Sequence, residues 1–331
     1  MSFPSRQAPK GWLWSEGQGV DAPSLVLRSP AKVNLGLRVI AKRPDGYHDI
    51  ESAFQLISLA DEITLTLQEG LVSCKVSGAS LPTDEANLAV KAAQALKAHA
   101  GVDSGVDITL KKRIPVGSGL GGGSSNAAAV LLGLNRLWDL SMDQEALVEL
   151  GAALGADVPF FLTAAAAWAE GKGDELTPLP PLEGLSIVLV NPGFSVSTAW
   201  AYGEVTFGLT KAAEALSMLR FLLEMRRFKE IGPYLHNDFE PIVEQTYPEV
   251  SMIKAALREG GAFGVTLSGS GPTVFGLFPE AASAESTLAV ARPGWTVTAI
   301  EPITDWERVF FVPLETAGEG EGFSPGQASG G

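Results

Sequence analysis

The strongest chemical signal in this sequence is a glycine-rich run of small residues between an expected strand and an expected helix. Five of the seven residues from 117 to 123 are glycine. A backbone without side chains can approach a ligand closely and turn its N–H groups inward, and the start of the following helix adds partial positive charge. The run therefore predicts a phosphate-binding loop formed by Pro115, Gly117, Ser118, Gly119, Leu120, Gly121, Gly122, Gly123, Ser124 and Ser125.

Other interpretations of this run fit its surroundings less well. Ser124 or Ser125 could cap an ordinary helix, but a cap needs one serine and no glycine run. Three of the glycines match the dinucleotide fingerprint, which belongs in a first βαβ unit with an acidic residue ending the next strand. Here β-rich chain precedes the run, and Asp139 ends a helix. The run also lacks the Gly-Lys-Ser/Thr ending of a Walker loop, so a lysine that contacts phosphate must come from elsewhere.

Lys32 lies in an alternating segment that predicts a strand. An inward-facing lysine is costly unless it meets an anion, so this position is a candidate for a phosphate contact. The alternative is a lysine on the exposed face of the strand. Asn34, two residues on, shares the face of Lys32 and could hydrogen-bond a substrate hydroxyl.

Asp157 lies in the segment Gly-Ala-Asp-Val-Pro, directly after an expected helix. A carboxylate near Lys32 would stay ionised and could accept a proton from a substrate hydroxyl, while the ammonium lowers the cost of the developing alkoxide. The same position suits a helix N-cap before Pro159. The residues alone support a general base and a helix cap about equally.

Two further turns carry candidate binding residues. Tyr47 and His48 follow the turn Pro44-Asp45-Gly46, where a solvated loop pair is the default interpretation. A second small-residue turn, Ser268-Gly269-Ser270-Gly271, lies between two expected strands. An ordinary hairpin would also explain that turn.

Composition and charge narrow the class of protein. The chain has 331 residues, 46% of them hydrophobic, and a net charge of −14, so it can bury a substantial core. Residues 1–113 hold 13 Lys and Arg against 12 Asp and Glu, whereas residues 114–331 hold 11 against 26. An acidic surface repels polyanions, which argues against nucleic acid as a partner. A site for a phosphate-bearing ligand should draw on the first third of the chain.

The remaining composition indicates a cytoplasmic protein without membrane contact. The longest apolar run, around residues 158–169, is too short to cross a bilayer. Cys74 is the single cysteine and cannot form an internal disulfide, which fits a reducing compartment. The other histidines, His99 and His236, are too scattered for a metal site, so no metal-ligating residues are predicted.

The elements that must position these residues follow from periodicity and turn signals. Residues 1–22 and 314–331 are expected to be disordered extensions. Strands are expected at 25–28, 33–40, 50–59, 63–67, 72–76, 106–114, 185–190, 263–267, 274–278 and 296–300. Helices are expected at 87–100, 125–138, 143–154, 211–225, 241–258 and 281–291. This order predicts an α+β protein with a domain junction near Asn191-Pro192-Gly193.

Three motifs resemble those of the GHMP kinase superfamily, which contains galactokinase, homoserine kinase, mevalonate kinase and phosphomevalonate kinase. They lie at residues 30–35, 115–129 and 267–272. Within the superfamily, the segments Arg43-Pro44-Asp45-Gly46-Tyr47-His48, Gly155-Ala156-Asp157-Val158-Pro159 and His236-Asn237-Asp238 resemble the branch that phosphorylates the cytidine diphosphate ester of methylerythritol. The resemblance covers about residues 25–312.

The resemblance implies a two-domain fold and a phosphotransfer reaction. A ribosomal-protein-S5-domain-2-like domain at 23–183 would bind ATP, and a ferredoxin-like domain at 184–313 would close the cleft. The implied reaction moves phosphate from ATP to the 2-hydroxyl of the cytidine ester, in non-mevalonate isoprenoid synthesis. Magnesium is expected with ATP, the partners would be small molecules, and the chain would be a monomer or a weak homodimer. A mevalonate-type kinase and a catalytically silent nucleotide-binding module remain as alternatives.

The resemblance also implies roles for single residues. It favours Asp157 as the general base, with Lys32 beside the transferring phosphate, and it has Ser268 and Gly269 close over the phosphates from the second domain. In the branch, Tyr47 and His48 would bind cytosine, the tyrosine ring by stacking and the histidine partly through its backbone. Tyr202 would be a second aromatic that sandwiches the base, although a core aromatic on a short helix would also fit. The residues implied at the acceptor end are Asn34, Tyr47, His48, Thr198 and Tyr202.

Overall fold

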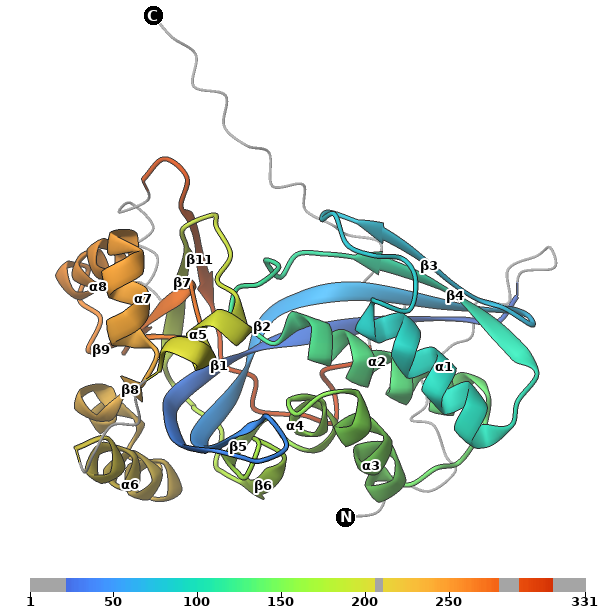
Figure 1. The fold of residues 1–331 in the computed structure, drawn as a ribbon, viewed down its shortest axis with the longest axis horizontal. Helices are drawn as coiled ribbons and strands as arrows, with labels where there is room; N and C mark the ends of the chain where they lie inside the picture. The colour runs from blue at the N-terminus through green and yellow to red at the C-terminus, as the bar shows by residue number, and fades with distance from the viewer. Residues whose placement is uncertain (1–21, 206–210, 280–291, 312–331) are drawn as a thin grey trace, which may run out of the picture.

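A computed structural model describes residues 22–205, 211–279 and 292–311. Within these ranges the chain forms two β-sheets with helices packed on them, so the expected α+β class is confirmed (Figure 1). Among the helices described there, not one has both the length and the apolar character needed to span a membrane.

The centre of the larger sheet is a hairpin of two long strands, β1 (Ser24–Lys42) and β2 (His48–Glu69). The sequence predicted two shorter strands in place of each, which was wrong. The strands stay paired through shifts in register, at Pro30/Ala31, Asn34/Gly36 and Val39/Ala41. A β-bulge bends a strand without ending it, so local pattern breaks were mistaken for strand ends.

The other strands of this sheet extend the hairpin on both sides. They are β3 (Val72–Ser77), β4 (Ser104–Lys111), β5 (Ala166–Glu170), β6 (Glu175–Pro178) and β8 (His236–Asn237). The main path runs β3-β4-β2-β1-β8, while β5 pairs with β2 and β6. The short strands β5, β6 and β8 were not predicted, because two to five residues are too few for an alternating pattern to stand out.

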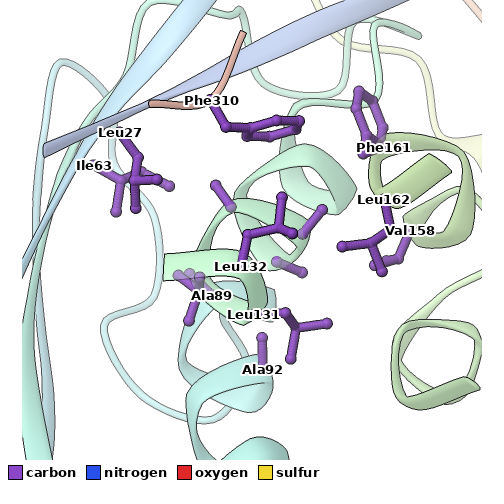
Figure 2. Packing of buried hydrophobic residues seen from close by; sticks show 14 of the residues in the cluster. Leu27, Ile63, Ala89, Ala92, Leu131, Leu132, Val158, Phe161, Leu162 and Phe310 are labelled. Carbon is purple, nitrogen blue, oxygen red and sulfur yellow. The ribbon is translucent and has the colours of Figure 1, made fainter. Parts of the chain in front are cut away.

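Helices α1 (Leu88–Ala100) and α2 (Gly122–Leu137) pack on this sheet, and α3 (Gln144–Leu154) and α4 (Val158–Thr163) pack on those helices. The side chains of Asn87 and Asp143 cap α1 and α3. The alanine- and leucine-rich α2 is buried between sheet and helices, where small side chains allow close packing. Figure 2 shows its core contribution, with Leu131 and Leu132 beside side chains from the strands and from α4.

The smaller sheet comes from the second half of the chain. Its strands are β7 (Ser186–Asn191), β9 (Gly264–Leu267), β10 (Val274–Phe278) and β11 (Thr296–Ile300). They are antiparallel in the order β11-β7-β10-β9, which is the ferredoxin-like arrangement that the resemblance implied. The helix expected at 281–291 lies outside the described residues.

Helices α7 (Glu240–Thr246) and α8 (Pro248–Glu259) replace the single helix predicted over 241–258. The prediction was wrong because Pro248 has no N–H to donate and cannot continue a helix, whereas it fits a first turn. Helix α8 packs on β9 and β10. The remaining elements are α5 (Thr198–Glu204), α6 (Lys211–Glu224) and the 3₁₀ turns η1 (Phe228–Glu230) and η2 (Gly232–Tyr234).

The two halves of the chain are interleaved at the larger sheet. Strand β8 pairs with β1, although it comes from the second half. The chain returns after β11, where the N–H of Ile303 donates to the carbonyl of Leu56 at 2.9 Å and the N–H of Arg28 donates to the carbonyl of Phe310 at 2.9 Å. Phe310 is buried in the core beneath the larger sheet (Figure 2). Residues 301–311 therefore pack on the first half of the chain.

Candidate active site

A cleft of about 890 Å³ is lined by residues from both halves of the chain. Its wall contains most of the residues singled out from the sequence. They are Lys32, Asn34, Tyr47, His48, Pro115, Gly117, Ser118, Gly119, Leu120, Gly121, Gly122, Gly123, Ser124, Asp157, Thr198, Tyr202 and Gly269. The fold thus brings residues that are far apart in sequence to one site.

The glycine run opens helix α2 without a side-chain cap. The N-cap residue is Gly121, in the left-handed region at φ 70°, and no side chain hydrogen-bonds to the first turn. The interpretation of Ser124 or Ser125 as a helix cap is therefore wrong. Since the first N–H groups of a helix have no intrahelical acceptor, this end of α2 can offer donors to an anion in the cleft.

The carbonyl groups of the run are held by other segments. The carbonyl of Leu120 accepts from the N–H of Lys32 at 3.0 Å, and the carbonyl of Gly119 accepts from the Ser268 hydroxyl at 2.9 Å. Gly119 has φ 77°, and a Cβ there would lie 2.0 Å from the carbonyl oxygen of Ser268. The two small-residue turns therefore touch, and a side chain at 119 would separate them.

Lys32 and Asp157 meet in the cleft. Lys32 Nζ lies 3.6 Å from Asp157 Oδ2, with side chains 5% and 33% exposed. The ammonium also donates to Asn34 Oδ1 at 2.6 Å and lies 4.7 Å from the centre of the Phe54 ring. Lys32 is thus a buried cation with a partner, and the interpretation as an exposed strand lysine is wrong.

Asp157 occupies the N-cap position of α4, but its side chain makes no capping hydrogen bond. The carboxylate instead faces the cleft and Lys32. The sequence left two roles open for Asp157, a helix cap and a general base. The structure shows no hydrogen bond that would support the cap. It places the carboxylate beside Lys32, which favours the ionised form that can accept a proton.

Hydrogen bonds through Ser52 fix the orientation of the Asn34 side chain. Its Nδ2 donates to the Ser52 hydroxyl at 2.8 Å, and Ser52 donates to the carbonyl of Gly36 at 2.6 Å. This chain of donors holds the amide oxygen toward Lys32. Asn34 therefore orients the ammonium, in addition to any contact with a substrate hydroxyl.

Aromatic side chains form the other end of the cleft. The rings of His48 and Tyr202 stack with centres 4.7 Å apart, and Tyr202 also contacts Phe239. Burial raises the pKa of the Tyr202 hydroxyl, and the nearby Asp157 charge raises it further, so the phenol stays neutral. Tyr47 is 54% exposed, and Lys172 Nζ lies 5.2 Å from the centre of its ring. Tyr202 is on a short helix but lines the cleft.

Comparisons with known proteins agree with this geometry. Residues 87–165 match the model of the GHMP kinases N terminal domain, and residues 212–292 match that of the GHMP kinases C terminal. A protein of Gloeobacter violaceus named 4-diphosphocytidyl-2-C-methyl-D-erythritol kinase is 45% identical over 276 residues, which are 81% of this chain and 91% of that protein. The namesake of Chlorobium phaeobacteroides is 46% identical over 82% of this chain and 95% of its own length. This chain belongs to the 4-diphosphocytidyl-2-C-methyl-D-erythritol kinase family.

A solved structure with the same family name supports the assignment. The crystal structure of a 4-(cytidine 5'-diphospho)-2C-methyl-D-erythritol kinase superimposes with a TM-score of 0.67 at 37% identity, covering 83% of this chain and 99% of that one. As a member of this kinase family, the chain is a GHMP kinase, a class that uses ATP. The family resemblance seen in the sequence motifs is confirmed.

Two residues predicted to contact phosphate in this family member do not form part of the cleft wall. Ser125 is fully buried, and its hydroxyl accepts from the Ser29 hydroxyl at 2.8 Å. Ser268 is also fully buried and donates to the carbonyl of Gly119. Both hydroxyls therefore bond to protein atoms, and they support the glycine run instead of facing a ligand.

Sequence reasoning missed Lys112, which also lines the kinase cleft. Its side chain is 4% exposed and its Nζ pairs with Asp61. A Cβ placed on Gly122 would lie 3.1 Å from Lys112 Nζ, so the ammonium sits at the first turn of α2. The signal was present, because three basic residues, 111–113, lie shortly before the glycine run.

Proposed function

We propose that this chain transfers the γ-phosphoryl group of ATP to the 2-hydroxyl of 4-diphosphocytidyl-2-C-methyl-D-erythritol, releasing ADP. The observation that carries the proposal is the meeting of Lys32 and Asp157 beside the glycine run in one cleft. We infer the identity of the acceptor from the names of the relatives. The reaction belongs to the non-mevalonate route to isoprenoid precursors.

The two ends of the cleft suit the two substrates. Beside the glycine run, the wall contains the apolar side chains of Leu81, Pro82 and Leu88, which suit the base of ATP while the run binds its phosphates. At the far end, Tyr47 and Tyr202 offer rings on which cytosine can stack. Thr198 lies nearby, and its hydroxyl is 3.0 Å from that of Ser270. Lys32 lies against Gly121 of the run, and its partner Asp157 lies near Tyr202, so this pair connects the two ends.

In the proposed mechanism Asp157 accepts the proton of the 2-hydroxyl while that oxygen forms its bond to the γ-phosphorus. The bond from the γ-phosphorus to the bridging oxygen breaks, and ADP leaves. Lys32 neutralises charge on the transferring group and on the new alkoxide. Because the transition state of phosphoryl transfer is loose, positioning by Lys32 and Asn34 contributes more than proton removal.

We also propose that magnesium enters with ATP. Oxygen ligands suit this ion, and the Ser124 hydroxyl and the Asp157 carboxylate both lie on the cleft wall. No group of three acidic, histidine or cysteine side chains within the described ranges could hold a metal by itself. The ion would therefore be held mainly by phosphate oxygens and water, and it would neutralise phosphate charge.

For partners and location, we propose small molecules and the cytoplasm. The net charge of −14 disfavours nucleic acid, and the single cysteine suits a reducing compartment. A monomer or a weak homodimer remains our prediction for the oligomeric state.

A coupled ADP-release assay on the purified full chain tests the function. With magnesium and ATP we expect turnover of the diphosphocytidyl substrate at least ~10²-fold faster than of mevalonate, because only the former fills the aromatic end. Phosphorus NMR of the product should locate the new phosphate on the 2-oxygen. Faster turnover of mevalonate would assign the chain to another GHMP activity, and ATP binding without turnover of either acceptor would favour a silent binding module.

A further inference from the structure

A buried carboxylate behind the cleft holds the chain where it enters the glycine run. Asp61, in β2, is 1% exposed. Its Oδ1 accepts from the backbone N–H of Arg113 at 2.8 Å and of Ile114 at 2.9 Å. These two residues connect β4 to the run, so one carboxylate oxygen fixes the path of the backbone into the loop.

The other oxygen of Asp61 reaches the far end of the run. Oδ2 accepts from Asn126 Nδ2 at 2.9 Å and pairs with Lys112 Nζ. Asn126 belongs to α2, and its Oδ1 lies 3.3 Å from Lys112 Nζ. The segments before and after the glycines are therefore tied to one side chain.

Ser29 completes this arrangement from the neighbouring strand. It is the register partner of Asp61 in the β1–β2 hairpin, next to the bulge at Pro30/Ala31. Its hydroxyl accepts from Asn126 Nδ2 at 2.9 Å and donates to the Ser125 hydroxyl. Both members of the cross-strand pair thus bind the start of α2.

The location of this network points to a role beyond packing. A buried charge is costly unless it is paired and hydrogen-bonded, and among the described residues the partners of the Asp61 carboxylate all lie within residues 112–126. We propose that the cross-strand pair Ser29 and Asp61 is a positioning device that holds the glycine run in its nucleotide-binding shape and directs Lys112 to the cleft. The pair does not line the cleft itself.

This inference rests on the proposed function in one respect, the identity of the nucleotide as ATP. A loop that is ordered before binding spends less binding free energy on ordering, so loss of the pair should weaken nucleotide binding selectively. Within the described part of the chain, the hydrogen bonds and the ion pair of the Ser29 and Asp61 side chains go to residues 112–126, and not one reaches the aromatic end of the cleft. Affinity for the cytidine substrate should therefore stay unchanged.

The test is titration calorimetry on the full chain with a non-hydrolysable ATP analogue and, separately, with the diphosphocytidyl substrate. For Asp61→Asn we expect the dissociation constant of the analogue to rise about tenfold or more, as for loss of hydrogen bonds to a charged group. Binding of the cytidine substrate should stay within about twofold. A lower melting temperature with unchanged analogue binding would overturn the proposal, and so would equal weakening of both ligands.

Two further variants keep the test decisive. Asp107→Asn is the matched control, because this carboxylate of β4 pairs with Lys75 on the surface, and it should change neither affinity. Ser29→Ala leaves no buried charge without a partner, so it still tests the pair if Asp61→Asn does not fold. We expect about twofold to fivefold weaker analogue binding from loss of its two hydrogen bonds, and unchanged binding would overturn the proposal. If the wild type bound the analogue but did not phosphorylate the cytidine substrate, the proposed function would fail while this test would stand.

Discussion

The two ends of the cleft are formed by different parts of the polypeptide, one by backbone and the other by side chains. The nucleotide end is mainly backbone, and its carbonyls at Gly119 and Leu120 are held by bonds from Ser268 and Lys32. The acceptor end is mainly side chains, namely Tyr47 on an exposed turn and Tyr202 on the seven-residue helix α5. A backbone site cannot adapt to an added atom, whereas a side-chain site can lose one contact and keep the rest. Substitutions should therefore be all-or-none at the first end and graded at the second.

The largest effect should come from Gly119→Ala. Its φ of 77° disfavours a side chain, and the added Cβ would meet the Ser268 oxygen at 2.0 Å, so the two turns must separate. A displacement of about 1 Å costs ~10²-fold in rate, and we expect at least that loss in kcat/KM for ATP. The matched control is Gly184→Ala, which has φ 65° with open space around its Cβ position. It should cost about 1 kcal/mol of stability and leave the kinetics unchanged, and an equal kinetic loss in both would contradict the clash.

The next largest effect compares two aspartates at helix starts. Asp143 caps α3 through a bond from Ala146 N–H at 2.9 Å, whereas Asp157 makes no such bond in α4. Asp157→Asn should lower kcat by roughly 10²-fold with little change in KM, the low end of general-base effects. Asp143→Ala should lower stability by about 1 kcal/mol with normal kcat. Steady-state kinetics and thermal melting separate the two, and near wild-type kcat in Asp157→Asn would remove Asp157 from the role.

The same contrast explains what could be predicted from the sequence. The glycine run was predicted because its chemistry is local, with the φ angles and the helix start contained in a dozen residues. The contact of Lys32 with Asp157 was expected by resemblance, but only the fold supplies its distance. The split between α7 and α8 could have been predicted from Pro248, and the helical assignment overlooked that signal.

Other parts of the site could not be predicted, because they depend on strand register. Ser29 and Asp61 belong to no motif, and they face Ser125 and Asn126 only through pairing next to a bulge. For the same reason Ser125 was predicted to contact phosphate, whereas its hydroxyl binds Ser29. A motif identifies which residues matter more reliably than it identifies the direction of each side chain.

At the acceptor end, Tyr202→Leu should give a graded loss. Removing one stacking ring costs about 1 to 3 kcal/mol, so KM for the cytidine substrate should rise roughly 5- to 150-fold while KM for ATP stays constant. The control is Tyr247→Leu, since that ring stacks on Phe194 at 4.7 Å and is not part of the cleft wall. It should change neither KM. A parallel rise in both KM values for Tyr202→Leu would mean that the ring supports the whole cleft rather than the base.

The smallest effect concerns His48, whose ring stacks on Tyr202. Burial lowers the pKa of His48 from its ordinary value of 6.5, and the nearby Lys42 charge lowers it further. The unfolded chain then takes up a proton at higher pH than the folded chain, so stability is complete above about pH 6.5 and is lost as pH falls through the lowered folded pKa. His48→Phe keeps a ring against Tyr202 and removes the titration.

We therefore expect the melting temperature of His48→Phe to fall less than that of the wild type between about pH 7.5 and 5.5. The difference should correspond to less than about 1 kcal/mol, because the ring is part-exposed and solvent screens its charge. Melting curves at both pH values, with each protein compared to itself, cancel the titration of all other groups. Equal losses in the two proteins would mean that proton uptake at His48 does not oppose folding.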